Sequence, residues 1–222
     1  MSFQIAIDGP AGAGKSTVAK EVARRLNYVY VDTGAMYRAM GLYLASKGAD
    51  GGPEEAVEAV CGGADIRLTC EDAGQKVWLN GEDVTESIRT EKAGMLASST
   101  SAFSAVRKKL TQLQKELART QDVVMDGRDI GTSVLPDAPL KIYLTASVAT
   151  RARRRFLELE EKGQVADLNE IEEDIRRRDE QDMTRKLSPL RQAEDAVMVD
   201  SSQMTAEEVV ERILELKKER EA

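Results

Sequence analysis

The sequence of 222 residues is 41% hydrophobic and 32% charged, and its formal net charge is −7. This composition is typical of a soluble globular protein with room for a domain and an insertion. It excludes a disordered chain and argues against a nucleic-acid-binding protein, which needs a basic surface. Because the chain has no histidine and two cysteines, a Cys/His zinc site and a Ser-His-Asp triad are excluded as well.

Location and redox state can also be predicted from the sequence. No apolar run approaches the length of a membrane span, and the N-terminus lacks a signal-peptide pattern, so we expect a cytosolic protein without a membrane partner. In that compartment we expect Cys61 and Cys70 to be reduced and inert.

Strand-like and helix-like segments alternate along most of the chain, as judged from hydrophobic periodicity. In chain order we predict strand 3–7, helix 15–26, strand 28–31, helix 35–46, a β-rich segment 65–84, a helix with Val106, Leu110, Leu113 and Leu117 on one stripe, strand 123–125, strand 141–146, helices 147–162 and 167–186, strand 196–200 and a terminal helix capped at Thr205. This alternation predicts an α/β fold with a parallel sheet flanked by helices.

The β-rich middle segment breaks this alternation. Its three short runs lie between residues 65 and 84, and the last two are joined by Asn80-Gly81, which is typical of a type I′ hairpin. We therefore predict a small antiparallel insertion there.

The strongest motif is the glycine-rich loop between the first predicted strand and helix, which contains G-x-x-x-x-G-K-S. Glycines let backbone N–H groups surround a phosphate, and the helix N-terminus adds positive charge. Lys15 is expected to reach the β- and γ-phosphate oxygens, and Ser16 to offer a hydroxyl to Mg²⁺. The predicted ATP-binding residues are Gly9, Pro10, Ala11, Gly12, Ala13, Gly14, Lys15, Ser16 and Thr17.

Two further loops follow predicted strands and so belong at the carboxyl edge of the sheet, where ligands bind. In DTGAMYR, Arg38 is suited to bind an anion, although it could also be a solvated arginine on a capped helix. In DGRD, Asp126 resembles a Walker B acid, and Arg128 and Asp129 are expected in the same crevice. The alternative for DGRD is a charged loop in solvent.

The predicted helix 167–186 carries an apolar stripe that continues into charged residues. Since the apolar part must face the protein, the charged part should face a cleft if the helix is straight. The alternative is a solvated, salt-bridged helix end. The stripe consists of Leu168, Ile171 and Ile175, followed by Arg178, Asp182 and Arg185.

The preceding helix contains the cluster RARRR at 151–155, with Val148, Ala152, Phe156 and Leu159 as its expected buried face. Arg151, Arg154 and Arg155 gather elsewhere on the helix and are interpreted as a mobile lid over the ATP phosphates. The alternative is ordinary pairing along the helix, such as Arg154 with Glu158. RNA binding is a third interpretation, which the acidic net charge disfavours.

Together these segments resemble the bacterial cytidylate kinases. The matching pieces run from the first strand to the last and include the β insertion: GPAGAGKST, DTGAMYR, IRT near Arg89, AFSAVR ending at Arg107, DGRDIGT and R-D-x-x-D-x-x-R from Arg178 to Arg185. The resemblance implies transfer of the γ-phosphoryl of ATP to CMP or dCMP, with Mg²⁺. It also implies a P-loop core at 1–61 and 91–222, an NMP-binding insertion at 62–90 and a lid at about 150–186.

The resemblance also implies a set of ligand contacts. Arg38, Arg128 and Arg185 correspond to residues that bind the CMP phosphate and, with Lys15, to the catalytic set. Ser98, Arg107 and Asp129 correspond to cytosine readers, and Tyr37, Arg178 and Asp182 to groups around the sugar. Thr33 is a further CMP-binding candidate, and Arg154 an ATP-binding one.

Other functions remain open on the sequence. Another small-molecule P-loop kinase, such as an adenylate or shikimate kinase, would share the phosphate loop but not the β insertion or the Arg107/Asp129 pair. A P-loop switch or ATPase would be expected to carry guanine-specific or oligomeric ATPase motifs, and none is recognised. We expect a monomer whose partners are its small-molecule substrates.

Overall fold

The computed structural model describes residues 2–71 and 74–221, apart from the side chains of residues 70, 71 and 74. The contacts divide the chain into two compact units, one of residues 3–28 and 124–222 and the other of residues 29–123. Cys61 is a buried free thiol, whereas the prediction for Cys70 lies outside the described side chains. No helix in the described part combines the length and apolar character that crossing a membrane requires.

The first unit is built on a parallel sheet, as predicted. The full sheet has five strands in the order β2-β6-β1-β7-β8, and β1 and β8 each pair with β7 in parallel. The edge strand β2 (Val29–Asp32) begins the second unit. The other four strands are β1 (Gln4–Asp8), β6 (Val123–Gly127), β7 (Leu140–Thr145) and β8 (Val197–Asp200).

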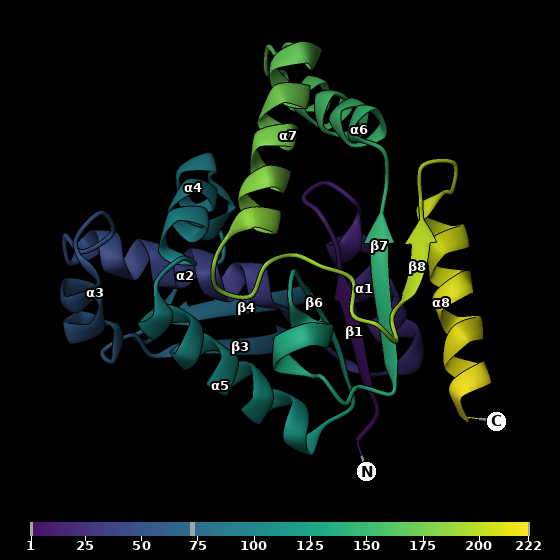
Figure 1. Ribbon diagram of the computed structural model, residues 1–222, viewed down its shortest axis with the longest axis horizontal. Coiled ribbons are helices and arrows are strands. Elements are labelled where there is room, and N and C mark those ends of the chain that lie inside the picture. The colour runs from purple at the N-terminus through teal and green to yellow at the C-terminus, as the bar shows by residue number, and fades with distance from the viewer. Residues whose placement is uncertain (1, 72–73, 222) are drawn as a thin grey trace. The chain divides into compact units, whose positions relative to one another are not determined.

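Four helices accompany this sheet in the first unit. The pair α1 and α8 pack on each other, and they contact β1 and β7 respectively (Figure 1). A short π-helical segment, η2, covers Ile130–Val134. The helices are α1 (Lys15–Leu26), α6 (Val148–Glu161), α7 (Leu168–Thr184) and α8 (Ala206–Glu221).

The local sequence explains where α1 begins and ends. Gly14 (φ 87°) precedes the helix and Asn27 (φ 56°) follows it, both in the left-handed region that glycine and asparagine tolerate best. Val18, Val22 and Ala23 are buried along one stripe, which is the core-facing pattern of an amphipathic helix. The helix therefore starts at the lysine of the phosphate motif.

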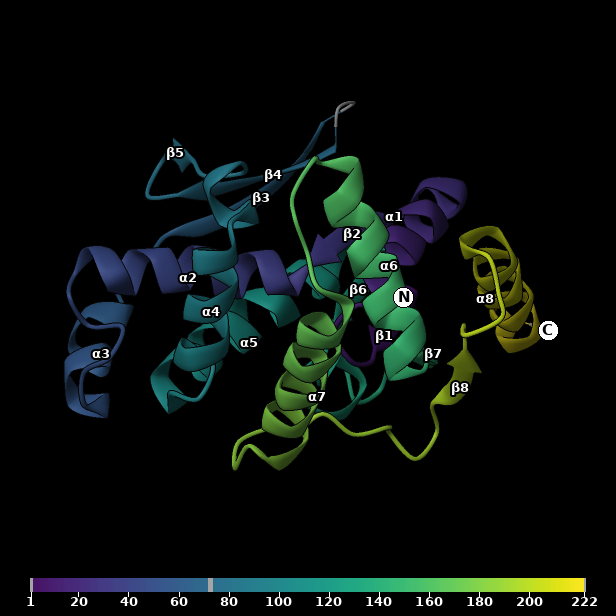
Figure 2. The same ribbon diagram turned by 90° about the horizontal axis from the view of Figure 1, so that it is seen from above.

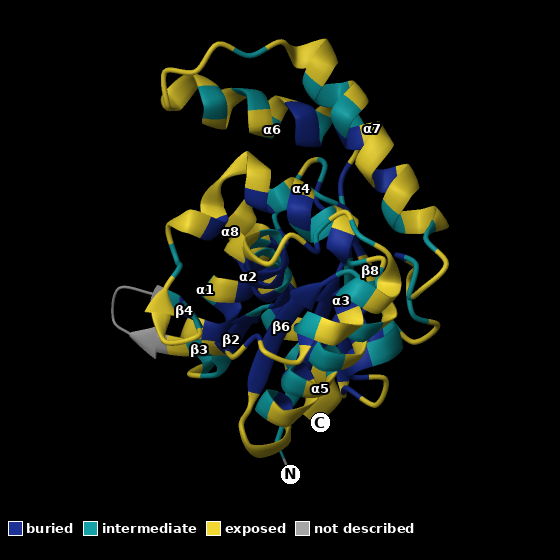
Figure 3. Cartoon of the chain, turned by 90° about the vertical axis from the view of Figure 1, so that its left-hand side faces the viewer, coloured by how far each residue is buried: buried dark blue, intermediate teal, exposed yellow. Residues whose placement is uncertain are grey.

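Helices α6 and α7 pack against each other and are largely exposed, in contrast to the buried strand β6 (Figure 3). Asp167 caps α7 by accepting the N–H groups of Asn169 and Glu170. The cap predicted at Thr205 also forms, since its Oγ1 accepts the N–H of Glu208. The predicted buried face of α6 is only partly correct. Ala152 is buried, but Phe156 is half-exposed and Arg151 is fully buried.

The second unit holds the small antiparallel sheet of β3 (Ile66–Glu71), β4 (Gly74–Leu79) and β5 (Glu82–Asp83). Between β4 and β5, Asn80 and Gly81 have φ angles of 50° and 86°, as a type I′ turn requires. The predicted hairpin is thereby confirmed.

The helices of the second unit gather around α2, which contacts α3, α4 and α5 (Figure 2). Helices α3 and α4 were not predicted, because they are short and lack a long apolar stripe. On α5, Val106 and Leu110 are buried as expected, but Gln114 is more buried than Leu113. The helices are α2 (Thr33–Ser46), α3 (Glu54–Cys61), the 3₁₀ turn η1 (Ser87–Arg89), α4 (Glu91–Thr100) and α5 (Ser104–Thr120).

Gly41 allows α2 and α4 to approach closely. A Cβ atom at Gly41 would lie 2.8 Å from Leu96 Cβ and 3.1 Å from the Ala97 backbone nitrogen. Real Cβ contacts of this length do not occur, so one helix would have to move. The packing of α2 on α4 therefore depends on glycine at this position.

We predict opposite effects for two glycine-to-alanine changes in these helices. Gly41→Ala should destabilise the protein by about 1–3 kcal/mol through overpacking. Gly94→Ala, in α4 with no atom within 4 Å of the added Cβ, should instead stabilise it by up to about 1 kcal/mol through helix propensity. Urea unfolding followed by circular dichroism measures both. If both variants changed the free energy of unfolding by the same amount, the close approach of α2 and α4 would not require glycine at position 41.

Candidate active site

The phosphate loop lies between β1 and α1, and the lysine of its motif bonds back to the loop itself. Lys15 is buried, and its Nζ donates a 2.7 Å hydrogen bond to the carbonyl oxygen of Pro10. Burial lowers the pKa of Lys15 to about 7, with Arg128 as a further cause. At Gly9 an added Cβ would lie 1.9 Å from the Leu144 carbonyl oxygen, so the loop can run this close to β7 only with glycine.

Two sets of contacts join the segment from Asp8 to Ser16 to the segment 126–131, which begins at the end of β6 and runs into η2. Ser16 Oγ donates to Asp126 Oδ2 at 2.9 Å. Asp8, the last residue of β1, accepts the N–H groups of Ile130 and Gly131, each at 2.7 Å. Burial raises the pKa of Asp8 to about 6, and the two N–H bonds oppose this rise. Asp8 did not stand out in the sequence, where a single acid at a strand end carries no motif.

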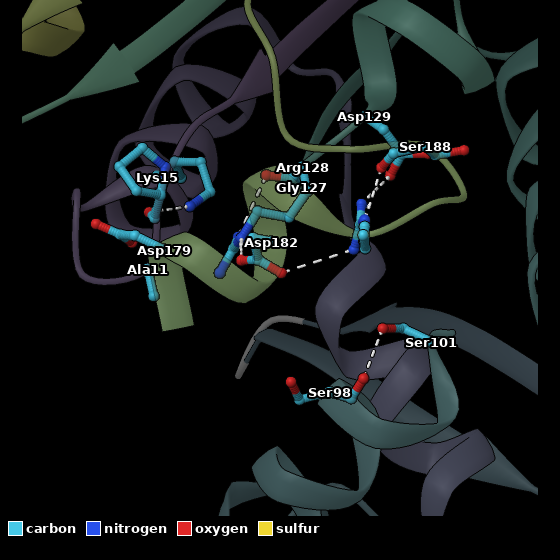
Figure 4. Close-up of polar contacts among 12 residues, drawn as sticks. Ala11, Lys15, Ser98, Ser101, Gly127, Arg128, Asp129, Asp179, Asp182 and Ser188 are labelled. Atoms are coloured by element: carbon cyan, nitrogen blue, oxygen red, sulfur yellow. Dashed lines mark hydrogen bonds and ion pairs between the residues drawn. The ribbon is translucent and has the colours of Figure 1, made fainter. Parts of the chain in front are cut away.

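The charged side chains of DGRD form a chain of ion pairs with α7. Arg128 Nε donates to Asp182 Oδ2 at 2.8 Å (Figure 4). Arg185 Nη2 lies 3.4 Å from Asp129 Oδ1, and Arg185 Nη1 lies 3.7 Å from Asp182 Oδ1. Positive and negative groups therefore alternate along this chain, and each cation is held in place by a carboxylate.

The predicted stripe on α7 is correct at its C-terminal end and wrong at two positions, because Leu168 and Arg178 are exposed. Asp182 and Arg185 were predicted to face a cleft rather than solvent, and both contact the DGRD loop, whereas Arg178 is exposed. The residue that continues the apolar stripe after Ile175 is Asp179, which is buried. A step of four residues keeps the side chain on the same face, whereas a step of three turns it toward solvent here.

Asp179 is buried because it pairs with Arg151 of α6. Arg151 Nη2 donates to Asp179 Oδ2 at 2.6 Å, and its other donors bond to the carbonyl oxygens of Ala146 and Ala11. Arg151 was predicted to be part of a mobile lid, and this is wrong. Its guanidinium is an internal clamp between α6, α7 and the phosphate loop, since one side chain offers five donors.

Arg154, the predicted ATP-binding lid residue, also lies beside the phosphate loop. Its Nη2 donates to the carbonyl oxygen of Ser201 at 2.7 Å, and its Nη1 would be 4.0 Å from a Cβ at Gly14. The expected alternative, pairing with Glu158, is made by Arg155 instead.

In the second unit, Arg38 lies at the N-terminal end of α2. Asp32 caps this helix by accepting the N–H of Ala35 at 2.8 Å, so α2 begins at Thr33, two residues before the predicted start. The same carboxylate accepts from Arg38 Nη2 at 3.2 Å. Arg38 Nε is buried and has no hydrogen-bond partner among the described atoms. Gln75 of β4 completes the local network by bonding to the backbone of Tyr30 and Asp32.

The remaining predicted acceptor residues of this unit lie on α2, α4 and α5. The guanidinium of Arg107 lies 5.7 Å from the centre of the Tyr37 ring and donates to the Ser101 carbonyl oxygen at 3.4 Å. Ser98 accepts a hydrogen bond through its carbonyl oxygen from Ser101 (Figure 4). Thr33 is buried at the first position of α2.

Comparisons with known proteins extend over nearly the whole chain. The family model described as cytidylate kinase matches residues 5–219. A cytidylate kinase from Caldicellulosiruptor saccharolyticus is 51% identical, with 96% of this chain and 95% of that protein covered. The corresponding protein of Lactobacillus johnsonii is 50% identical, with 96% and 93% covered. That of Thermotoga neapolitana is 45% identical, with 99% of both covered.

Solved structures agree on the fold. An uncharacterised protein from Eubacterium ventriosum aligns with a TM-score of 0.54 at 12% identity, covering 97% of this chain and 98% of that one. A shikimate kinase from Acinetobacter baumannii aligns with a TM-score of 0.50 at 17% identity, covering 99% and 94%. The family match and the identities near 50% decide the assignment: the chain belongs to the cytidylate kinase family and phosphorylates CMP or dCMP with ATP.

Proposed function

We propose that the reaction is a direct in-line transfer without a covalent enzyme intermediate. A phosphate oxygen of CMP bonds to the γ-phosphorus of ATP while the bond from that phosphorus to the β,γ-bridging oxygen breaks, giving CDP and ADP. Two anions must be aligned against their mutual repulsion, so catalysis depends on positioned cations. The observation that carries this proposal is the double link between the phosphate loop and the DGRD loop, which sets Arg128 beside Lys15.

ATP is assigned to the phosphate loop and Arg154. When the phosphates enter, Lys15 would exchange its bond to the Pro10 carbonyl oxygen for phosphate oxygens, which offer full negative charge. The Ser16 hydroxyl and the Asp126 carboxylate, 2.9 Å apart, fit Mg²⁺, because this ion takes oxygen ligands and few of them from protein. Bound there, Mg²⁺ would neutralise charge on the β- and γ-phosphates.

The CMP phosphate is assigned to Arg38, Arg128 and Arg185. The buried Nε of Arg38 supports this, since a buried donor without a partner is costly and an incoming anion would satisfy it. Arg128 and Arg185 are each held by carboxylates of the same unit, so their side chains are ordered before substrate binds.

The base and the sugar are assigned to separate groups. Ser98, Arg107 and Asp129 are the proposed cytosine readers, and the Tyr37 ring and Ser101 carbonyl already orient Arg107. Tyr37, Asp182 and Arg178 are proposed for the sugar, and Thr33 for CMP in general. For Arg178, which is exposed, this assignment requires a closing movement on substrate binding.

We further propose that the chain works as a monomer in the cytosol. A coupled ADP-release assay with CMP, dCMP, UMP, AMP and shikimate as acceptors tests the substrate assignment. Turnover with CMP and dCMP well above the others is expected, and a preference for AMP or shikimate would contradict it.

Lys15→Ala should leave the fold intact and lower kcat by about 10²–10³-fold, because a charge aimed at the transferring phosphoryl group is lost. The exposed Lys20 on the same helix supplies the control, and Lys20→Ala should keep normal turnover. Steady-state kinetics with circular dichroism checks both. Near-normal activity of a folded Lys15→Ala protein would remove this lysine from the mechanism.

Arg185→Ala should cost about 2–5 kcal/mol in kcat/KM for CMP, because a buried phosphate would lose a charge-assisted partner. The exposed Arg220 of α8 is the matched control and should cost far less when replaced by alanine. The measurement is kcat/KM for both variants at one salt concentration. Similar losses at the two positions would mean that Arg185 is only a member of a structural ion pair.

Asp129→Asn should reduce the preference for CMP over UMP by at least about tenfold. A carboxylate facing the cytosine N4 amino group matches a donor, whereas uracil presents an acceptor at that position, and unpaired polar groups give strong discrimination. The asparagine amide can turn an N–H toward uracil O4. The ratio of kcat/KM for CMP and UMP is measured in both proteins. A parallel fall of both values would assign Asp129 to loop structure instead.

A further inference from the structure

Asp8 makes an unusual pair of contacts for a residue that has no assigned role. Its side chain is 4% exposed at the end of β1. Oδ1 accepts the N–H of Ile130 and Oδ2 accepts the N–H of Gly131, both at 2.7 Å. Both oxygens of one carboxylate are therefore committed to two consecutive backbone groups, immediately after Arg128 and Asp129.

These two N–H groups need an acceptor from outside their own segment. Ile130 and Gly131 open the short π-helix η2, and the first N–H groups of a helical turn have no partner within it. The Asp129 carbonyl oxygen accepts from Ser133 and Val134 further along. Asp8 satisfies the open end and thereby fixes the direction in which the chain leaves Asp129.

The surroundings of Asp8 leave this contact little freedom. A Cβ at Gly131 would lie 3.4 Å from Asp8 Oδ2 and 3.2 Å from Lys141 Cδ. Lys141 is itself buried, and its Nζ bonds to the carboxylate of Asp195 and to the Pro136 carbonyl oxygen. The packed side chain of Lys141, whose Nζ is already bonded, therefore leaves the backbone at Gly131 little room to move away from Asp8.

We propose that Asp8 is a positioning residue for base selection, acting through the backbone of Ile130 and Gly131 to set the placement of Asp129. The inference rests on the proposed role of Asp129 as a cytosine reader. A carboxylate is required because both oxygens must accept, whereas an asparagine amide offers one acceptor and turns its NH₂ group toward a backbone N–H. Two opposed donors repel, so the loop shifts at the residue next to Asp129.

The test compares kcat/KM for CMP and UMP in Asp8→Asn and Asp8→Ser, expressed per folded enzyme. The serine side chain is one bond shorter, so this variant removes both acceptors without placing an NH₂ donor against a backbone N–H. It provides a second route if the asparagine protein folds poorly. We expect the CMP/UMP ratio to fall by about tenfold, in the same direction as in Asp129→Asn, because a displaced Asp129 carboxylate would no longer pair with the cytosine N4 amino group. The KM for ATP should change less than the KM for CMP.

Ile7→Val is the matched control for stability. Ile7 is fully buried on the same strand, so this change removes one core methyl group while both Asp8 contacts stay in place. It should leave the CMP/UMP ratio unchanged. If the ratio also stays unchanged in both Asp8 variants while CMP and UMP activities fall together, Asp8 is purely structural and the proposal is wrong.

The Asp129→Asn protein separates this failure from that of the proposed function. If Asp129→Asn lowers the CMP/UMP ratio and the Asp8 variants do not, the positioning role fails while the base reader stands. If Asp129→Asn leaves the ratio unchanged, the base assignment fails and the role of Asp8 in selection fails with it.

Discussion

The contact between Asp8 at the end of β1 and the first residues of η2 is the constraint on which the geometry of the first unit's candidate site depends. The phosphate loop starts at Gly9, directly after Asp8. Arg128 and Asp129 lie directly before Ile130. Because the Asp8 carboxylate binds the N–H groups of Ile130 and Gly131, the two loops keep a fixed spacing. Ser16 and Asp126 add a second link, so Lys15 and Arg128 approach each other in spite of their like charge.

That approach has an electrostatic cost, which the carboxylates around it offset. The pKa of Lys15 is lowered chiefly by burial and then by Arg128, while Asp126, Asp8 and Asp182 act in the opposite direction. An acidic chain, with a net charge of −7, can in this way hold a local group of cations. ATP and CMP would bring further negative charge to these cations, whose side chains the carboxylates already hold in place.

In the second unit, the proposed acceptor residues are held in place by different means. A helix cap, a glycine contact and a cation–π pair act there instead of a shared carboxylate network. Asp32 both caps α2 and holds Arg38, Gly41 sets the distance between α2 and α4, and Tyr37 lies against Arg107. The β insertion contributes through Gln75, which bonds to the backbone on either side of Val31 just before this cap.

Much of this molecule could be predicted from sequence because its signals are local. The phosphate motif, the Asn80-Gly81 turn and the strand-helix alternation each depend on residues close together in the chain. The resemblance to cytidylate kinases spans the chain, but each of its matching pieces is a short motif. Arg151 and Asp179 could not be predicted, since an arginine among arginines looks solvated until a buried partner 28 residues away is known. Asp8 was missed for the same reason, because its partners lie 122 and 123 residues away. Hydrophobic periodicity shows which face of a helix is apolar. Burying a charge costs free energy unless the charge is paired, and only the tertiary structure decides which charged residue has a partner within reach.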